Sequence, residues 1–393
     1  MVQRQVVLTS SDESLIDGYR PDDCFFLSSP QGMLLTEGEL VAVAASEEPD
    51  KLAALSRDVA KAWDDAKRKG VTNPIVVGAV PFDPAKPAKL VVPVSVRRAE
   101  PSTSSEEPSK RESAGSVIDI AEVPAQEGYM SGVAEAVSRI QDGEFSKIVL
   151  SRTLQLTSAA AVDPAVLLRN LARSNPRGYT FAVPLPQSTL VGASPELLVS
   201  RKGLQVVANP LAGSAARSAD PEEDQRRAVA LLVSEKDLHE HAVVIQAVAE
   251  ALRPFCRTLD VPDRPSLLQT PTMWHLSTEI KGDLLDPATT SLELAAALHP
   301  TPAVCGTPTD LARQAIQQIE PFDRGFFTGM VGWCDASGNG EWIVTIRCAE
   351  VSGRFLRLFA GAGIVGASKP EDELKETSAK FRTMLNAMGL DRI

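Results

Sequence analysis

Hydrophobic and polar residues alternate with a period of two along several parts of this chain, and a helical period separates those parts. The alternation predicts strands over residues 147–156 and 190–207, and a second group over 341–351 and 354–359. A period near 3.6 predicts helices over 52–69, 126–142, 163–174, 221–252, 291–298, 309–319 and 370–388. Ser234 and Asp237 resemble a capping box that restarts the helix within 221–252, and Gly389 suits the C-terminal cap of the last helix. Hairpins, helices and hairpins follow one another without regular strand–helix alternation. This order predicts an α+β fold with large antiparallel sheets.

One stretch, residues 97–116, reads RRAEPSTSSEEPSKRESAGS and carries almost no apolar side chain. A segment of this composition cannot bury a core, so it is predicted to be a solvated loop. The strands predicted before it have no obvious core of their own. We therefore interpret the loop as an excursion within one domain spanning residues 1–393.

Composition and charge restrict the partners of this chain. Its 44% hydrophobic and 23% charged residues are typical of a globular protein, and its net charge of −11 argues against nucleic acid. An anionic ligand must then be held by local positive charge. No apolar run approaches a membrane span or a signal peptide, which predicts a cytoplasmic protein without a membrane partner. The five cysteines are odd in number and far apart, which predicts free thiols rather than disulfides.

Three charged residues on the last predicted helix, Glu373, Glu376 and Lys380, stand at i, i+3 and i+7. This spacing places them on one side of the helix, beside an inward apolar stripe. For an isolated helix, the pattern favours a solvated ladder of ion pairs. Just before the helix, residues 361–366 match G-x-G-x-x-G formally. A dinucleotide-binding fold needs a further parallel strand, for which the remaining residues leave no room.

Glu240 stands between His239 and His241 in a predicted helix. Two histidines that are two positions apart on a helix point in nearly opposite directions, so they cannot bind one zinc ion together. Glu240 lies on the side of Val244, and a carboxylate that faces a core needs a partner. Arg347 is expected on a strand, on the face opposite Val344 and Ile346, where its guanidinium can bind a carboxylate bidentately.

Five segments together resemble the chorismate-binding enzyme family, and within it the isochorismate synthases that feed dihydroxybenzoate siderophore pathways. They are SKIVLSR at 146–152, GASPE at 192–196, PLAGS at 210–214, SEKDLHEH at 234–241, and residues 359–380. The likeness is dense over residues 126–390 and weak in the N-terminal third. It implies one large domain in which two big antiparallel sheets carry peripheral helices.

The resemblance also implies a role for each matching residue. It makes Lys147 the base that activates water and Glu196 the acid that protonates the leaving hydroxyl. It makes Glu240 and Glu376 the ligands of a Mg²⁺ ion, with Glu373 as a nearby carboxylate. The residues that it implies as substrate contacts are Gly213, Ser214, His275, Ala303, Arg347, Gly361 and Lys380.

The activity implied is the reversible, Mg²⁺-dependent conversion of chorismate to isochorismate, by an isomerase that adds water at C2 and removes the C4 hydroxyl. The family precedent implies a monomer that contacts downstream pathway enzymes. A salicylate synthase, which goes on to eliminate pyruvate, shares the same motifs and remains an alternative. A second alternative is a catalytically silent chorismate-binding subunit. It is disfavoured because the chain retains Lys147, Glu196, Glu240 and Glu376. Lys147 and Ala212 disfavour an amidotransferase-coupled subunit.

Overall fold

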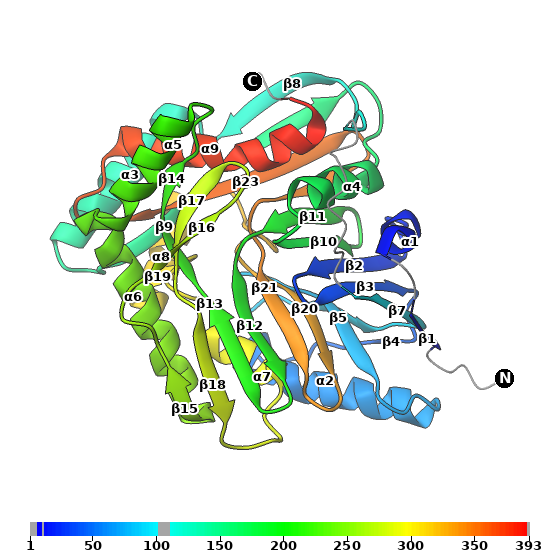
Figure 1. The fold of residues 1–393 in the computed structure, drawn as a ribbon. Coiled ribbons are helices and arrows are strands. Elements are labelled where there is room, and N and C mark those ends of the chain that lie inside the picture. The colour runs from blue at the N-terminus through cyan, green and yellow to red at the C-terminus, as the bar shows by residue number, and fades with distance from the viewer. Residues whose placement is uncertain (1–5, 10–11, 101–110, 391–393) are drawn as a thin grey trace.

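Two large β-sheets face each other and carry most of the helices on their outer faces (Figure 1). The structure is a computed structural model that describes residues 6–9, 12–100 and 111–390. The first sheet, called sheet A here, runs in the order β1 (Val6–Thr9), β7 (Ser95–Ala99), β3 (Gly32–Glu37), β2 (Cys24–Ser29), β10 (Tyr179–Pro184), β11 (Thr189–Ser194), β22 (Cys348–Ser352), β23 (Phe355–Ile364), β9 (Lys147–Ser158) and β19 (Gly306–Thr307), with β8 (Val117–Val123) also paired to β9.

The second large sheet, sheet B, faces sheet A. Its order is β15 (Cys256–Asp260), β18 (Ile280–Leu284), β13 (Gln205–Asn209), β12 (Leu197–Lys202), β21 (Gly340–Val344), β20 (Met330–Asp335), β5 (Ile75–Val80), β6 (Lys89–Val92) and β4 (Val41–Ala42). A small sheet C contains β14 (Leu211–Ala216), β17 (Met273–Ser277) and β16 (Ser266–Gln269). Among the described strands every pairing is antiparallel except that of β1 with β7, which confirms the predicted α+β class.

An apolar core fills the space between the two large sheets. It joins Phe181 and Phe359 of sheet A to Val77, Val331 and Ile343 of sheet B. Helices cover the outer faces and bury their apolar stripes there. Those that contact sheet A are α1 (Asp12–Asp17), α3 (Gln126–Gln141), α4 (Pro164–Ser174), α8 (Thr309–Ile319) and α9 (Pro370–Met388). Those that contact sheet B are α2 (Lys51–Arg68), α6 (Glu235–Leu252) and α7 (Ser291–Leu298), and α5 (Pro221–Leu232) packs on sheet C.

Two connections between strands carry the chain from one large sheet to the other at the same place. One runs from β11 to β12 through Pro195 and Glu196, and the other from β21 to β22 through residues 345–347. Val344 N donates to Glu196 O at 3.2 Å, and Ala193 N donates to Arg347 O at 3.1 Å, so the two crossings are tied together. These hydrogen bonds fix Glu196 and Arg347 at the seam between the sheets.

The strands predicted over 190–207 and 341–351 are not continuous. Each is interrupted where the chain passes from one large sheet to the other. Arg347 is therefore not on a strand face opposite Val344 and Ile346, as the alternation predicted. It lies between two strands with φ +51°, an uncommon left-handed conformation for a side chain other than glycine. The predicted helical region 221–252 is two helices that meet at Ser234, where the helix was predicted to restart, and the Ser234 side chain caps α6 by accepting from Asp237 N.

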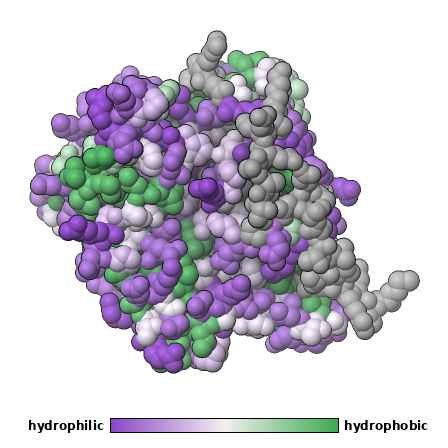
Figure 2. All heavy atoms as spheres, viewed as in Figure 1, coloured by the Kyte–Doolittle hydropathy of each residue, from purple (hydrophilic) through white to green (hydrophobic). Residues whose placement is uncertain are grey.

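The predicted loop over residues 97–116 begins inside β7, which ends at Ala99, and its central part, 101–110, lies outside the described residues. All five cysteines are free, as predicted. Within the described ranges, no helix combines the length and the apolar character needed to cross a membrane. Polar and charged residues predominate on the face shown in Figure 2, among scattered apolar patches.

Candidate active site

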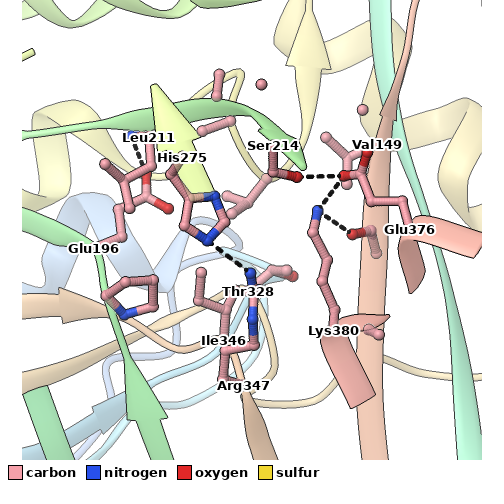
Figure 3. A pocket seen from close by; sticks show the side chains of 18 of the residues that line it. Val149, Glu196, Leu211, Ser214, His275, Thr328, Ile346, Arg347, Glu376 and Lys380 are labelled. Atoms are coloured by element: carbon pink, nitrogen blue, oxygen red, sulfur yellow. Dashed lines mark hydrogen bonds and ion pairs between the residues drawn. The ribbon is translucent and has the colours of Figure 1, made fainter. Parts of the chain in front are cut away.

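A cavity opens beside the seam, where sheets A, B and C meet α6 and α9. It encloses about 610 Å³ of empty space, the open solvent at its mouth included. Its lining contains all but one of the residues that the sequence singled out for catalysis, substrate contact or metal binding: Glu196, Gly213, Ser214, Glu240, His275, Ala303, Arg347, Gly361, Glu376 and Lys380. The exception, Lys147, lies behind this surface. Figure 3 shows Glu196, His275 and Arg347 toward one side and Glu376 with Lys380 toward the other.

Glu196 lies in the crossing from β11 to β12, and only 3% of it is exposed. Burial raises the pKa of its carboxyl group to about 7, because the charged form loses its hydration. The N–H of Leu211, 3.4 Å from Oε1, and the positive charges of Lys147, Arg347 and Lys380 oppose this rise. A carboxyl group with such a pKa carries its proton at neutral pH often enough to act as an acid.

His275 and Arg347 form a second buried pair at the same end of the cavity. Arg347 Nη2 donates to His275 Nε2 at 3.2 Å, which leaves the ring proton on Nδ1. Burial lowers the pKa of His275 well below its usual range, and the charges of Arg347 and Lys380 lower it further. Burial also lowers the pKa of Arg347 to about 10. The pair is therefore a neutral imidazole beside a guanidinium that stays charged at neutral pH.

Helix α9 supplies the opposite end of the cavity. Glu376 Oε1 accepts hydrogen bonds from Ser214 Oγ at 2.9 Å and from Lys380 Nζ at 2.5 Å, and Lys380 also donates to Gly361 O at 2.9 Å. These partners outweigh the burial of Glu376, so its pKa is lowered. The i, i+4 spacing on α9 thus places an ionised carboxylate and its cation side by side.

Glu240 projects from α6 toward the same end and meets Lys147, the first residue of β9. The Lys147 Nζ atom lies 3.0 Å from Glu240 Oε1, and the lysine side chain is fully buried. The ion pair lacks hydrogen-bond geometry, and no other described residue accepts a hydrogen bond from this ammonium group. Gly363 of β23 makes room for the pair, because a side chain there would collide with Glu240 Oε1.

Comparison with known proteins agrees with this geometry. A family model described as chorismate binding enzyme matches residues 88–389. The chain belongs to the chorismate-binding enzyme family. It is 59% identical to isochorismate synthase DhbC of Bacillus subtilis, over the full length of both chains. It is 43% identical to the vibriobactin-specific isochorismate synthase of Vibrio cholerae, over 100% of this chain and 98% of the relative.

Among solved structures, DhbC from Bacillus anthracis superimposes with a TM-score of 0.89 at 55% identity. The superposition covers 96% of this chain and 99% of the DhbC chain. The resemblance drawn from the five sequence segments is thereby confirmed at the level of the family and of its siderophore-type members. The roles of individual residues stay predictions.

The chorismate-binding family implies a Mg²⁺ ion, and the donors present fit one. Among the described residues no group of three or more His, Cys, Asp or Glu side chains is arranged to hold a metal. Mg²⁺ does not need such a group, because it is commonly bound by one or two carboxylates and completes its shell with water and substrate oxygens. Glu240 and Glu376 both line the cavity and provide hard oxygen donors, whereas His241 uses both ring nitrogens in hydrogen bonds to Ala212 and Thr278.

Sequence reasoning missed a buried pair that supports the cavity wall of this chorismate-binding enzyme. Arg324 Nη2 donates to Glu320 Oε1 at 2.6 Å and to Val149 O at 2.7 Å, and Arg324 Nη1 donates to Val304 O at 2.8 Å. Val149 and Val304 both line the cavity. The i, i+4 spacing of Glu320 and Arg324 was the available signal, but ordinary surface pairs share it. The apolar lining residues Phe327, Ile346 and Phe359 give no signal of their own.

Proposed function

We propose that this protein is an isochorismate synthase, an isomerase that converts chorismate reversibly into isochorismate for the biosynthesis of a dihydroxybenzoate siderophore. The observation that carries the proposal is that one cavity combines a carboxyl group able to hold a proton at neutral pH, Glu196, with an ionised carboxylate–lysine cluster at its other end. The relatives named isochorismate synthase, at 59% and 43% identity over the full chain, support the same activity.

In the proposed reaction, water attacks C2 of the ring while the C4 hydroxyl leaves and the double bond between them shifts. Lys147 is the base that takes a proton from the attacking water. Glu196 gives its proton to the departing hydroxyl, which leaves as water. One water molecule is therefore consumed and one released, and the reverse reaction exchanges the two roles. General acid and base groups of this kind each contribute roughly 10²- to 10⁴-fold to a rate.

Substrate binding falls to the remaining residues of the cavity. Chorismate carries two carboxylates, and Arg347 offers a guanidinium that can bind one of them bidentately. Ser214, Gly213 and Lys380 surround the end at which the ring carboxylate would lie. The neutral imidazole of His275 can orient a ring hydroxyl without adding charge. Ala303 and Gly361 complete the wall with backbone.

Glu240 and Glu376 would hold the Mg²⁺ ion, with Glu373 close by. When bound, the ion supplies positive charge to the ring carboxylate, a contribution of several kcal/mol in metalloenzymes. An exposed ion pair contributes only about 0–1 kcal/mol, which is too little to hold a dianion in an acidic protein. The carboxylates of α6 and α9 therefore serve binding and orientation, while Lys147 and Glu196 move the protons.

Product analysis tests this function. Purified protein is incubated with chorismate and Mg²⁺, and the products are separated by chromatography, with an EDTA control. We expect isochorismate in equilibrium with chorismate, and none with EDTA. Salicylate and pyruvate would identify a salicylate synthase, and unchanged chorismate would leave a binding role. Light scattering of the same preparation tests the proposed monomer.

A further inference from the structure

Three glutamates near the α9 end of the cavity are each paired with a different lysine. Glu240 pairs with Lys147 at 3.0 Å, and Glu376 pairs with Lys380 at 2.5 Å. The third pair joins Glu373 Oε1 to Lys236 Nζ at 2.6 Å. The proposed function assigns a role to both lysines of the first two pairs. It gives none to Lys236.

The Lys236–Glu373 pair bridges the first turns of two helices, α6 and α9. The glutamate side chain is 1% exposed and the lysine side chain 29%, so the ammonium group is the part that faces solvent. An open groove with about 600 Å³ of empty space runs past it, lined by Lys236, Asp237, Glu373 and Lys375, among others. The groove shares Ser214 and Glu376 with the main cavity. Lys236 therefore stands on the solvent side of the carboxylates.

The Lys236 charge acts on more than its direct partner. Glu376 and Glu240, the two carboxylates that would hold the ion, also lie close enough to interact with this ammonium group electrostatically. A fixed positive charge beside a cation site opposes the binding of any further cation. The same charge keeps three neighbouring glutamates from repelling one another when no ion is bound.

We propose that Lys236 is a built-in counter-charge that lowers the affinity of the Glu240–Glu376 site for divalent cations and stabilises the ion-free protein. This inference rests on the proposed function only through the assignment of those two glutamates to the metal. It makes Lys236 a determinant of metal affinity and gives it no part in the chemical steps.

The test measures metal binding to metal-free protein without substrate, by calorimetry with Mg²⁺ and with Mn²⁺, at pH 8 so that Glu373 is ionised. We expect Lys236→Met to bind both ions about tenfold more tightly than the wild type, since one opposing charge is removed. Lys375→Met is the matched control: Lys375 lines the same groove but pairs with exposed Asp372 at 3.0 Å. It should stay within about twofold of the wild type, because an exposed pair is screened.

A double-mutant cycle separates charge from packing. Glu373→Gln should weaken metal binding about tenfold, and Lys236→Met/Glu373→Gln should return it close to the wild type, because the two charges cancel. The rise in melting temperature caused by Mg²⁺ should be larger in Lys236→Met than in the wild type. A folded Lys236→Met protein with unchanged or weaker metal affinity would overturn the proposal. Product analysis is a separate experiment. If isochorismate formed although no metal binding could be measured, the counter-charge proposal would be refuted and the proposed synthase activity would stand.

Discussion

The two ends of the cavity hold ionisable side chains in opposite ways. At the seam, Glu196, His275 and Arg347 stand on or beside chain crossings between sheets, and burial is the largest influence on the pKa of each. At the α9 end, Glu240, Glu373 and Glu376 stand on helices, and a lysine lies beside every one of them. Burial is also the largest influence on the pKa of Glu373 and of Glu376. Pairing with lysine outweighs it for Glu376, whose pKa is lowered, but not for Glu373, whose pKa is raised to about 7. The contrast between the two ends is therefore that between Glu196 and Glu376.

This difference matches two different chemical tasks. Burial without a strong cationic partner favours the neutral form of a carboxyl group, which suits an acid that must hold a proton. Pairing with lysine favours the ionised form, which suits a group that must hold a cation. The same amino acid can therefore serve both tasks within one cavity, and its surroundings decide which.

Replacing the acid at the seam should have the largest effect. We expect Glu196→Gln to lower kcat for isochorismate formation by about 10³-fold, because Gln has no proton to give. Glu341→Gln is the matched control, since Glu341 is also buried and burial raises its pKa to about 7, but it does not line the cavity. Its kcat should stay near that of the wild type. Equal losses in both variants would show that any buried glutamate matters, and would remove Glu196 from the chemistry.

Replacing a carboxylate at the α9 end should come next. We expect Glu240→Gln and Glu376→Gln to lower kcat by about 10²-fold and to weaken Mg²⁺ binding measured by calorimetry, since each removes a charged donor. Glu250→Gln on the same helix as Glu240 is the control, because Glu250 is exposed and accepts a hydrogen bond from Gln246. Wild-type rates in both cavity variants would be incompatible with the metal assignment.

The pH dependence of turnover should show that the acid lies at the seam end of the cavity. We expect this effect to be smaller than that of the substitutions above. The acid must be protonated, and the pKa of Glu196 is raised to about 7. Turnover of chorismate should therefore fall as pH rises above that value, by about tenfold per pH unit once the group is mostly ionised. Rates measured from pH 6 to 9 provide the check. A rate that keeps rising through pH 8 would point to another proton donor.

The smallest expected effect is on the free energy of unfolding, and here Glu196 and its control residue Glu341 should behave alike. Folding raises both pKa values from 4.5 to about 7, so the folded state disfavours ionisation. Each group's contribution to the free energy of unfolding is complete below pH 4.5 and is lost as pH rises through 7. The total loss is about 3 kcal/mol at most for each group. Urea unfolding of Glu196→Gln and Glu341→Gln should thus show a smaller loss of stability between pH 5 and 8 than the wild type does. A slope equal to that of the wild type in either variant would contradict the raised pKa of the replaced glutamate.

The helices at the α9 end were predictable, and the geometry at the seam was not. The apolar stripe and Gly389 cap of α9, and the Ser234 cap of α6, are local patterns, and both helices form where these patterns place them. Arg347 was misplaced because its run of residues alternates like a strand, whereas the chain there leaves one sheet for another with φ +51°. No local pattern encodes such a crossing, since it depends on strands distant in sequence. The same holds for the Lys236–Glu373 pair, whose partners are 137 residues apart.

Because the two crossings are hydrogen-bonded to each other, the geometry of the site depends on how sheet A and sheet B are aligned. Glu196 and Arg347 are fixed to the seam by the hydrogen bonds from Val344 and Ala193, so neither can keep its place if one sheet slides against the other. A change in the core between the sheets, at Phe181 or Val331 for example, is transmitted to both side chains at once. Turnover should therefore report loss of alignment between the sheets before the fold itself is lost.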